Sequence, residues 1–275
     1  MKVMLLRLEQ YIFVINNWGN MTKEFFIGKA NNTAKKPSKI LVGNSSNIAK
    51  EVKSIFVGNS SNKAVKVFPS FPDTYQKVEY IFNTGGTQYI NTGVKPNSNT
   101  TVYCECELSN RTPTTGYIFG CYNDYETSAN RMWYYADALS GTIEYYYGSN
   151  AALGRKTSAI DTRYKILVNV SGGEFYLNNE SLGSSTVTFP STYSPNILIF
   201  AAYAKTTNST PYASVSQQFM RLYHFQIKQD NILARDMYPC YLKSDTQTVG
   251  MYDLISGQFY ANSGTGIFYK GPDVN

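Results

Sequence analysis

The sequence is poor in the residue types that most often carry catalysis or metal binding. Its 275 residues include 1 histidine, 4 cysteines and 2 tryptophans. One histidine leaves little scope for imidazole catalysis or zinc ligation. No nucleophile elbow, phosphate-binding loop or zinc motif occurs. Four cysteines are too few for a disulfide framework of this size, which fits folding in a reducing cytoplasm.

Charge and long apolar runs are also scarce. Charged residues make up 16% of the chain and the net charge is +6. The N-terminal lysines alternate with apolar residues, which is typical of solvated strand faces rather than of a phosphate-binding track. We therefore expect no nucleic-acid partner.

The first twenty residues allow more than one interpretation. Arg7, Glu9 and Gln10 interrupt the apolar stretch, so we expect no membrane insertion. Residues 5–15 could form a short helix. Alternatively, Met21 is the natural start and residues 1–20 are an upstream extension.

Tyrosine, by contrast, is abundant. The chain has 24 tyrosines, and aromatic residues make up 15% of it. Tyrosine is a strand former with a polar tip, which suits half-exposed sheet faces and contacts with sugars or proteins. A large two-sheet β protein would explain the same excess.

A short repeat occupies residues 27–68. Gly28, Gly43 and Gly58 recur at a spacing of fifteen, and the string Val-Gly-Asn-Ser-Ser-Asn occurs at both 42–47 and 57–62. Glycine and asparagine tolerate positive φ, so each unit predicts a strand, a tight turn and a return strand. We expect a small meander of three or four strands. So few strands need a neighbour or sister chains to bury one face.

The remaining chain reads as short strands separated by turns. Pro69 and Pro72 indicate a linker over residues 69–74. Beyond it, alternation predicts strands at 101–108, 117–121, 132–136, 142–147, 165–170, 174–177, 186–189, 197–203, 217–227, 249–253, 258–260 and 267–269. Only residues 232–237 read as a helical turn. Asn178-Asn179 predicts a tight hairpin turn.

The strand 101–108 carries the best acidic pair of the chain. Its period of two places Cys104 and Cys106 on the core face, as small buried hydrophobes, and Glu105 and Glu107 on the opposite face. Retaining glycoside hydrolysis needs two carboxyls about 5 Å apart. We interpret this pair instead as part of a solvated strand face, and His224 as a structural imidazole in the middle of a strand.

The predicted ligand site combines aromatic rings with short polar groups over residues 122–147. Sugar recognition needs an aromatic platform together with groups that read hydroxyls. The alternative is that these rings fill the space between two sheets or an oligomer interface. The predicted site residues are Tyr122, Asn123, Asp124, Tyr125, Arg131, Trp133, Tyr135, Tyr145 and Tyr147. No catalytic residue, metal ligand or cofactor is predicted, and structural calcium is not indicated.

Several strings after the linker resemble one family. The first two strings are Tyr75-Gln-Lys-Val-Glu-Tyr-Ile and Gly86-Thr-Gln-Tyr-Ile-Asn-Thr-Gly. The later strings are Met220-Arg-Leu-Tyr-His-Phe, Asp236-Met-Tyr-Pro-Cys, Val249-Gly-Met-Tyr-Asp-Leu, Gly257-Gln-Phe-Tyr and Asn262-Ser-Gly-Thr-Gly. They resemble the laminin-G-like, concanavalin-A-type jelly rolls of prophage proteins. The Val-Gly-Asn repeats are similar to repeats that precede such domains in phage tail and fibre proteins.

The resemblance implies an all-β, antiparallel two-sheet jelly-roll sandwich after a small β-meander. The expected layout is an N-terminal extension (1–24), a repeat attachment region (25–68), the linker (69–74) and the jelly roll (75–275). The implied role is that of a virion protein of the tail tip, fibre or head fibre, made in the bacterial cytoplasm. By analogy it is a homotrimer that binds a host-surface glycan and joins other virion proteins through residues 25–68. The alternatives are a bacterial surface or secreted carbohydrate-binding module and, less favoured, a glycoside hydrolase.

Overall fold

The computed structural model divides into two compact units, Met1–Pro72 and Asp73–Asn275. It describes the backbone of residues 3–8, 11–16, 24–28, 41–43, 49–51, 55–58, 64–68, 71–110, 116–122, 131–137, 141–147, 154–169, 174–184, 195–204, 212–215 and 219–274. Side chains are described for residues 71–109, 116–121, 141–146, 154–168, 174–184, 195–202 and 219–274. The division between the units falls within the segment predicted as the linker.

In the first unit the described backbone consists of short antiparallel strands. Strands β1 (Val3–Leu8), β2 (Tyr11–Asn16) and β3 (Glu24–Gly28) form one sheet. The helix considered for residues 5–15 is therefore wrong, because β1 and β2 pair as a hairpin. The repeat units form two separate hairpins, β4 (Leu41–Gly43) with β5 (Ala49–Glu51) and β6 (Ile55–Gly58) with β7 (Ala64–Phe68).

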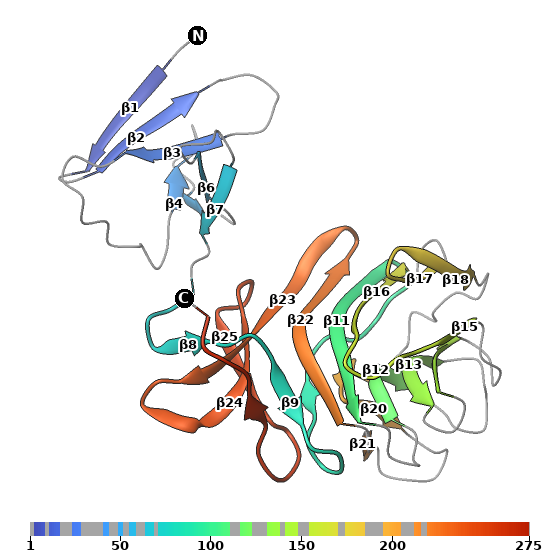
Figure 1. The fold of residues 1–275 in the computed structure, drawn as a ribbon. Coiled ribbons are helices and arrows are strands. Elements are labelled where there is room, and N and C mark those ends of the chain that lie inside the picture. Colours follow the sequence, from blue (N-terminus) through green and yellow to red (C-terminus); the bar gives the residue numbers. More distant parts are fainter. Residues whose placement is uncertain are drawn as a thin grey trace. The chain divides into compact units, whose positions relative to one another are not determined.

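The second unit contains two large sheets (Figure 1). The long sheet has the order β18 (Glu180–Ser184), β17 (Glu174–Leu177), β16 (Arg163–Asn169), β11 (Thr100–Asn110), β22 (Phe219–Gln229), β23 (Ile232–Leu242), β24 (Asp245–Asp253), β25 (Gln258–Ala261), joined by β8 (Tyr75–Lys77), β9 (Ile81–Asn83) and β26 (Tyr269–Lys270). The second sheet has the order β10 (Ile90–Asn91), β19 (Leu198–Ile199), β12 (Gly116–Tyr122), β13 (Arg131–Asp137), β14 (Thr142–Tyr147), β15 (Gly154–Thr157), joined by β20 (Ala201–Ala204) and β21 (Tyr212–Val215).

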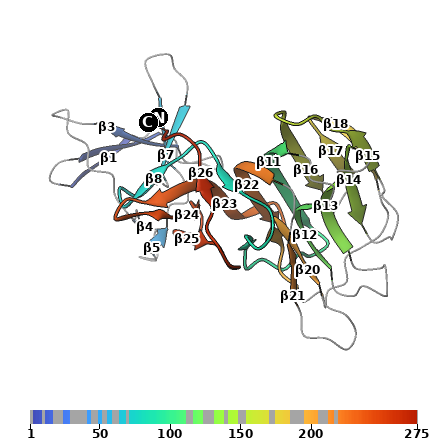
Figure 2. The ribbon, with the colours of Figure 1, turned by 60° about the horizontal axis from the view of Figure 1, so that its bottom comes forward.

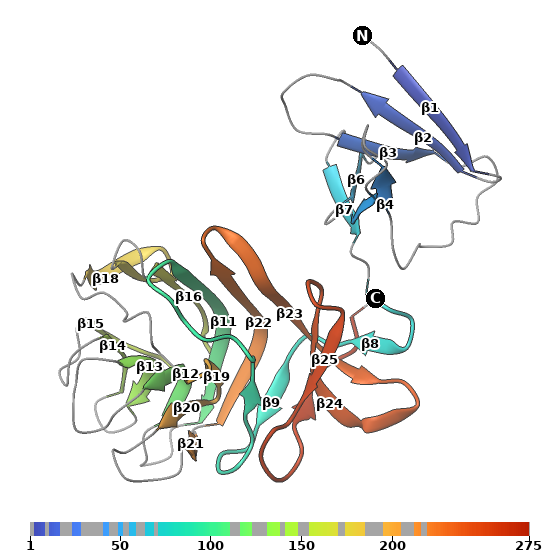
Figure 3. The ribbon, with the colours of Figure 1, turned by 180° about the vertical axis from the view of Figure 1, so that it is seen from behind.

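The predicted fold class, an all-β antiparallel two-sheet sandwich, is confirmed. Within the described residues no helix occurs, and so none that could cross a membrane. The strand pairs of the described residues are antiparallel except β12 with β20. Seen from behind, β12, β19 and β20 lie against β11 and β22 (Figure 3).

The core lies between the two sheets and is built from alternate residues of their strands. Phe119 of β12 meets Phe225 of β22 edge to face, with ring centroids 5.5 Å apart. Tyr145 of β14 stacks on Phe175 of β17 at 3.7 Å. All four rings are fully buried. Aromatic pairs of this kind stabilise the fold by more than their buried area alone would.

Cysteine burial follows the predicted alternation along β11. Cys104 and Cys106 are fully buried in the core, and all four cysteines of the chain are free. Burial raises the pKa of the Cys104 thiol well above its usual range and raises that of Cys240 to about 12. These thiols therefore act as small apolar side chains.

One prediction within the sandwich is wrong. Residues 232–237 form the start of strand β23 rather than a helical turn. Asp230 and Asn231 both have positive φ, which makes a tight turn and returns the chain along β22. Pairing with β22 thus decides the conformation of this segment. The predicted turn at Asn178-Asn179 is confirmed, since both residues have positive φ between β17 and β18.

A second difference concerns the strand predicted over 197–203. The buried Phe200 has φ 62° and divides this segment into β19 and β20. Its ring centroid lies 5.7 Å from that of Phe268. A left-handed conformation at a bulky residue is unfavourable, and here it accompanies complete burial of the ring. The strand predicted at 186–189 lies outside the described residues.

The two sheets approach each other closely at one edge of the sandwich, where β15 lies beside β18 (Figure 2). Lys156 and Glu180 form an ion pair across this edge. A Cβ at Gly154 would lie 2.6 Å from the carbonyl oxygen of Leu182. The close approach therefore requires glycine at this position.

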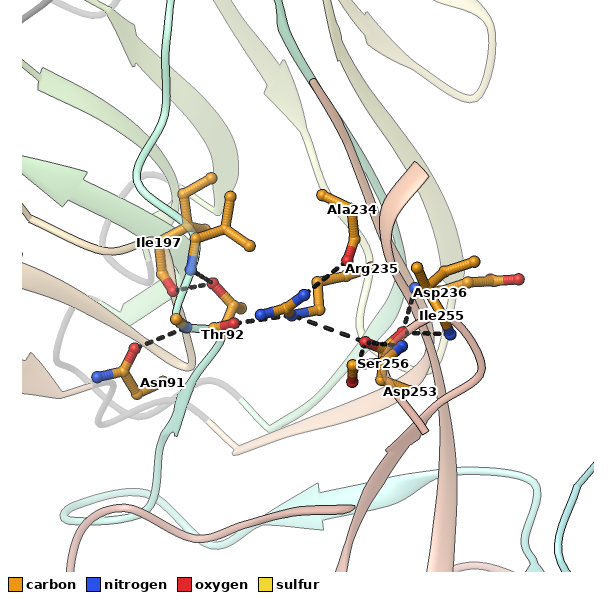
Figure 4. A network of polar contacts seen from close by, with 11 residues as sticks. Asn91, Thr92, Ile197, Ala234, Arg235, Asp236, Asp253, Ile255 and Ser256 are labelled. Carbon is orange, nitrogen blue, oxygen red and sulfur yellow. Dashed lines mark hydrogen bonds and ion pairs between the residues drawn. The ribbon is translucent and has the colours of Figure 1, made fainter. Parts of the chain in front are cut away.

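A polar network ties the long sheet to the second sheet (Figure 4). Arg235 of β23 donates from Nε to the carbonyl of Thr92 at 2.9 Å, and the Thr92 hydroxyl donates to the carbonyl of Ile197 at 2.7 Å. The buried carboxylate of Asp253 accepts from the backbone N–H groups of Asp236, at 2.7 Å, and Ile255, at 3.1 Å. Because Asp253 is fully buried, these bonds replace the water that it loses on folding.

The opening and closing segments of the second unit are paired. Strand β26 pairs with β9, Val78 bridges Asp273, and the backbone N–H of Val274 donates to the carbonyl of Lys77 at 2.9 Å. The strings 86–93 and 262–266, which carry the family resemblance, also meet. The Asn262 side chain accepts from the backbone N–H of Tyr89 at 3.0 Å.

Candidate functional site

The outer face of the long sheet carries a continuous set of charged and aromatic side chains, which we call the polar face. Its members come from β8, β11, β16, β22 and β23 and the segment after β8. They are Lys77, Tyr80, Tyr103, Glu105, Glu107, Arg163, Arg221, Tyr223, His224, Gln226, Asp236 and Tyr238. In Figure 1, β11 lies between β16 and β22 in the middle of this sheet.

A β-bulge increases the number of side chains on this face. The register between β11 and β22 shifts between Glu105 and Cys106, so that Glu105 pairs with His224 and Cys106 with Leu222. Tyr223 is the extra residue. The core residues Leu222 and Phe225 flank it and His224, so two consecutive side chains point outward. Bulges often re-aim side chains in this way next to functional sites.

Glu105 is held in the middle of the face. The Tyr103 hydroxyl and Arg163 both donate to its carboxylate, Arg163 at 2.5 Å. Burial raises the pKa of this carboxyl, but the bonds from Tyr103 and Arg163 and the charges of Arg163 and Lys165 together lower it below its usual value. Its side chain is only 13% exposed. The prediction of a solvated strand face is therefore wrong.

Glu107 repeats the arrangement. It is 7% exposed, pairs with Arg221, and accepts a hydrogen bond from the Tyr223 hydroxyl at 2.7 Å. Burial and the bond to Glu107 raise the pKa of Tyr223 well above its usual range. Its phenol therefore stays a donor at neutral pH.

His224 joins strand β22 to strand β23 on this face. Its Nε2 lies 2.8 Å from Oδ1 of Asp236, which also accepts from Gln226 at 2.8 Å. Its ring stacks on Tyr238, with centroids 4.3 Å apart. The ring lies in the middle of β22 as expected, and its purely structural role stays a prediction.

Cations lie over several of the rings. The guanidinium of Arg163 lies 3.9 Å from the ring centroid of Tyr223, and Lys77 lies 4.7 Å from that of Tyr238. Such contacts fix both partners in place. The face thus presents oriented rings and hydrogen-bonding groups before any ligand arrives.

Both carboxylates of the polar face are already engaged. Glu105 is bonded to Tyr103 and Arg163, and Glu107 to Tyr223 and Arg221. Within the described part of the chain, no three His, Cys, Asp or Glu side chains come together as metal ligands. What the arrangement can do is donate and accept hydrogen bonds beside flat apolar rings.

The predicted site residues fall on the second sheet or outside the described residues. Asn123, Asp124 and Tyr125 lie outside the described residues. For Tyr122 in β12, Arg131, Trp133 and Tyr135 in β13, and Tyr147 in β14, the backbone alone is described. Tyr145 is fully buried and stacks on Phe175, so its ring fills the space between the sheets, as in the alternative interpretation.

The strand register separates the predicted positions into two sets. Position 133 pairs with Tyr146 and position 135 with Glu144, whereas Tyr145 pairs with position 134. Glu144 is 1% exposed and accepts from Tyr146 at 2.8 Å and Arg155 at 2.6 Å. The described polar cluster of this sheet is therefore Glu144, Tyr146 and Arg155, in register with positions 133 and 135.

The polar face was missed because its members are distant in sequence. Glu105 and Arg163 are 58 residues apart, and Glu107 and Arg221 are 114 apart. One local signal was present. In Leu222-Tyr223-His224-Phe225, two consecutive polar-tipped rings between two apolar residues break the period of two and indicate a bulge.

Comparisons with known proteins find similarity in solved structures alone. No family model and no curated protein sequence matches the chain. The carbohydrate-binding module CBM66 from Bacillus subtilis aligns with a TM-score of 0.35 and 11% identity, over 54% of this chain and 84% of that chain. A Trypanosoma rangeli sialidase in complex with sialic acid aligns with a TM-score of 0.37 and 12% identity, over 81% of this chain and 42% of that chain.

A native heptameric SAP-like pentraxin from Limulus polyphemus gives a TM-score of 0.33 and 12% identity, over 58% of this chain and 73% of that chain. This chain spans less than half of the sialidase. Similarities at this level carry no functional argument.

Proposed function

We propose that residues 73–275 form a lectin-like domain that binds a host-surface glycan through the polar face without cleaving it. The observation that carries the proposal is the paired arrangement of Glu105 and Glu107. Both carboxylates lie on the outer face of β11. Each is paired with one arginine and accepts a hydrogen bond from one tyrosine.

This arrangement suits sugars for two reasons. A pyranose offers an apolar face that packs on aromatic rings and hydroxyls that bond to fixed donors and acceptors. The side chains of the polar face already hold one another, so little conformational entropy remains to be lost on binding. Arg163, with 46% of its side chain exposed, is the best-placed donor to a ligand.

The same arrangement argues against hydrolysis. Cleavage needs one carboxyl that is protonated and can give its proton to the leaving group. Both Glu105 and Glu107 instead accept from an arginine and a tyrosine, so neither is placed to donate a proton. A non-enzymatic role is therefore part of the proposal.

The test uses two matched arginines, one on each sheet. Arg163 pairs with Glu105 on the polar face, and Arg155 pairs with Glu144 on the second sheet. After a glycan-array screen of the full chain, we expect Arg163→Gln to weaken binding at least tenfold and Arg155→Gln to leave it unchanged. The reverse result would move the site to the second sheet, and no binding by the wild type would refute the proposal.

We further propose that the chain is a virion protein of the fibre, tail-tip or head-fibre type. The support is the fifteen-residue repeat, which forms two matching hairpins, together with the resemblance of the strings after residue 75. In this role residues 25–68 join other virion proteins, and the chain assembles as a homotrimer in the bacterial cytoplasm before entering the particle.

Two measurements test the virion role. Mass spectrometry of purified particles should detect the chain, and light scattering should give three times the 30.9 kDa monomer mass. A chain that is found on bacterial cell walls and is absent from particles would favour the bacterial surface module. A reducing-end assay that detects cleavage, lost in Glu105→Gln and Glu107→Gln, would favour the glycoside hydrolase.

A further inference from the structure

His224 is the one histidine of the chain, and the β-bulge turns it outward on the polar face. Its partner in the register is Glu105 of β11, and the core residues Leu222 and Phe225 flank it and Tyr223. The imidazole side chain is 15% exposed. A ligand that lies on the polar face can therefore reach part of this ring.

Asp236 fixes the ring proton on one nitrogen. Its Oδ1 lies 2.8 Å from Nε2 of His224 and also accepts from the side-chain amide of Gln226. A carboxylate offers acceptors only, so the imidazole bonds to it as a donor, from Nε2. In the neutral ring the other nitrogen is then an acceptor. The geometry therefore leaves a lone pair on Nδ1.

Two neighbouring rings hold the imidazole in this orientation. The ring of Tyr238 stacks on it with centroids 4.3 Å apart and an interplanar angle of 22°. The ring of Tyr103 meets it edge to face at 5.6 Å. Because the ring is already oriented, little conformational entropy is lost when a ligand bonds to it.

Nδ1 differs from the other acceptors of the polar face. Both carboxylate oxygens of Glu105 and both of Glu107 already accept from an arginine or a tyrosine. Oδ1 of Asp236 is bonded to His224 and Gln226. By contrast, no described residue donates to Nδ1, and this atom is not one of the buried polar atoms that lack a partner. It is therefore open to a donor from outside the protein.

Resting on the proposed glycan-binding function, we infer that His224 is a ligand-binding residue whose Nδ1 accepts a hydrogen bond from a donor group of the glycan. The donor is either a hydroxyl or the N–H of an acetamido group, which are the donors that uncharged sugars carry. A purely structural imidazole would need only the bond from Nε2 to Asp236. The two roles use different nitrogens, so substitutions can separate them.

Protonation of the ring should weaken this bond. The charged groups packed around the ring are Asp236 of β23, Glu105 of β11 and Lys77 of β8, which lies over Tyr238. The pKa of Glu105 is lowered and those of Tyr103 and Tyr238 are raised, so these three groups keep their charge between about pH 5.5 and pH 8. Histidine is the side chain that ordinarily changes charge in this interval. A proton on Nδ1 converts it from an acceptor into a donor.

Matched substitutions separate the two nitrogens. His224→Gln can still donate an amide N–H to Asp236 but has no acceptor in place of Nδ1, whereas His224→Phe loses both groups. His224→Gln should unfold at the same urea concentration as the wild type, and His224→Phe at a lower one. Both should weaken glycan binding by at least about tenfold. The control is Arg155→Gln on the second sheet, which should leave binding unchanged.

The probe is a glycan array that includes chitotriose, cellotriose and mannotriose, each also in permethylated form. With the full chain, affinity for the bound glycans should fall by at least about threefold from about pH 8 to about pH 5.5. Residual binding by His224→Gln should not change with pH. The permethylated forms keep acceptor oxygens but have no O–H or N–H group, so they should not bind. Preference for chitotriose would assign the acetamido N–H, and preference for the other two would assign a hydroxyl.

Three outcomes would count against the inference and leave the proposed glycan binding intact. The first is wild-type affinity in His224→Gln with a loss only in His224→Phe, which would make the imidazole purely structural. The second is a wild-type affinity that does not change with pH. The third is equal binding of a glycan and its permethylated form. Failure of the wild type to bind any glycan of the array would instead overturn the proposed function itself.

Discussion

Strand β11 carries buried side chains on both of its faces, and each face buries them by different means. On the inner face, Cys104 and Cys106 are fully buried among apolar neighbours. On the outer face, Glu107 is 7% exposed, yet it is a carboxylate paired with Arg221 and bonded to Tyr223. Burial alone therefore does not distinguish a core from a site, whereas the chemistry of the partners does.

The two faces should also differ in what they contribute. Apolar burial on the inner face stabilises the fold in proportion to area. The charged groups of the outer face lose hydration on folding, and the attraction within each ion pair offsets that loss. They therefore add little net stability and mainly fix the positions of the side chains. The following predictions, in order of decreasing effect, test this division.

The largest effect should come from the inner face. Phe225 is fully buried and meets Phe119 of the opposite sheet at 5.5 Å. Phe225→Ala should lower the free energy of unfolding by about 3–5 kcal/mol, through lost transfer energy and the cavity that remains. Urea denaturation measures this. A loss below about 1 kcal/mol would mean that the two sheets do not share this core.

Breaking an outer ion pair should cost less than that, and the cost should be recoverable. Arg221→Ala leaves the Glu107 carboxylate buried beside Tyr223 without its cation, and should cost about 1–3 kcal/mol, since Arg221 is partly exposed. The double variant Arg221→Ala with Glu107→Gln should regain most of the loss. A double variant as unstable as the sum of both single variants would show that the pair is not coupled.

Acid should weaken the outer face selectively. The pKa of Glu105 is lowered on folding from its usual value of 4.5, so the stability that it contributes is complete above pH 4.5 and is lost as the pH falls through its folded value. The urea midpoint should therefore drop between pH 6 and pH 3. In Glu105→Gln this drop should be smaller, and an identical drop in both proteins would contradict the assignment.

The smallest effect is an absence of reaction at the buried cysteines. Burial raises the pKa of the thiols of Cys104 and Cys240, the latter to about 12. Because the thiolate is the reactive form, a colorimetric thiol reagent at pH 7.5 should modify none of the 4 cysteines in the folded chain and all of them in denaturant. Rapid modification without denaturant would place a cysteine outside the core.

Most strands could be predicted because alternation is a local property. The sequence of β11 shows which residues share a face, and the core positions Val102, Cys104 and Cys106 follow directly from it. The tight turn at Asn178-Asn179 was equally local. The pair Asp230-Asn231 was the same kind of signal, and reading it as a turn would have predicted β23 in place of a helical turn.

The polar face could not be predicted in the same way. Alternation shows that Glu105 points away from the core, but not that Arg163 and Tyr103 cover it there. Those contacts depend on which strands become neighbours, and strand order is set by the whole fold rather than by any one strand. The aromatic rings of residues 122–147 drew attention to the second sheet for the opposite reason, since they are conspicuous locally.

The pairing of residues 77–82 with 269–274 has a consequence for how the sandwich forms. Strand β9 has partners in β22 and β26, and Val78 bridges Asp273. The first strands of the unit therefore cannot complete their pairing until a segment almost two hundred residues further along the chain has been synthesised. Such long loops close slowly. During synthesis the long sheet stays unfinished until its final segment emerges, so the sandwich should fold late and nearly all at once.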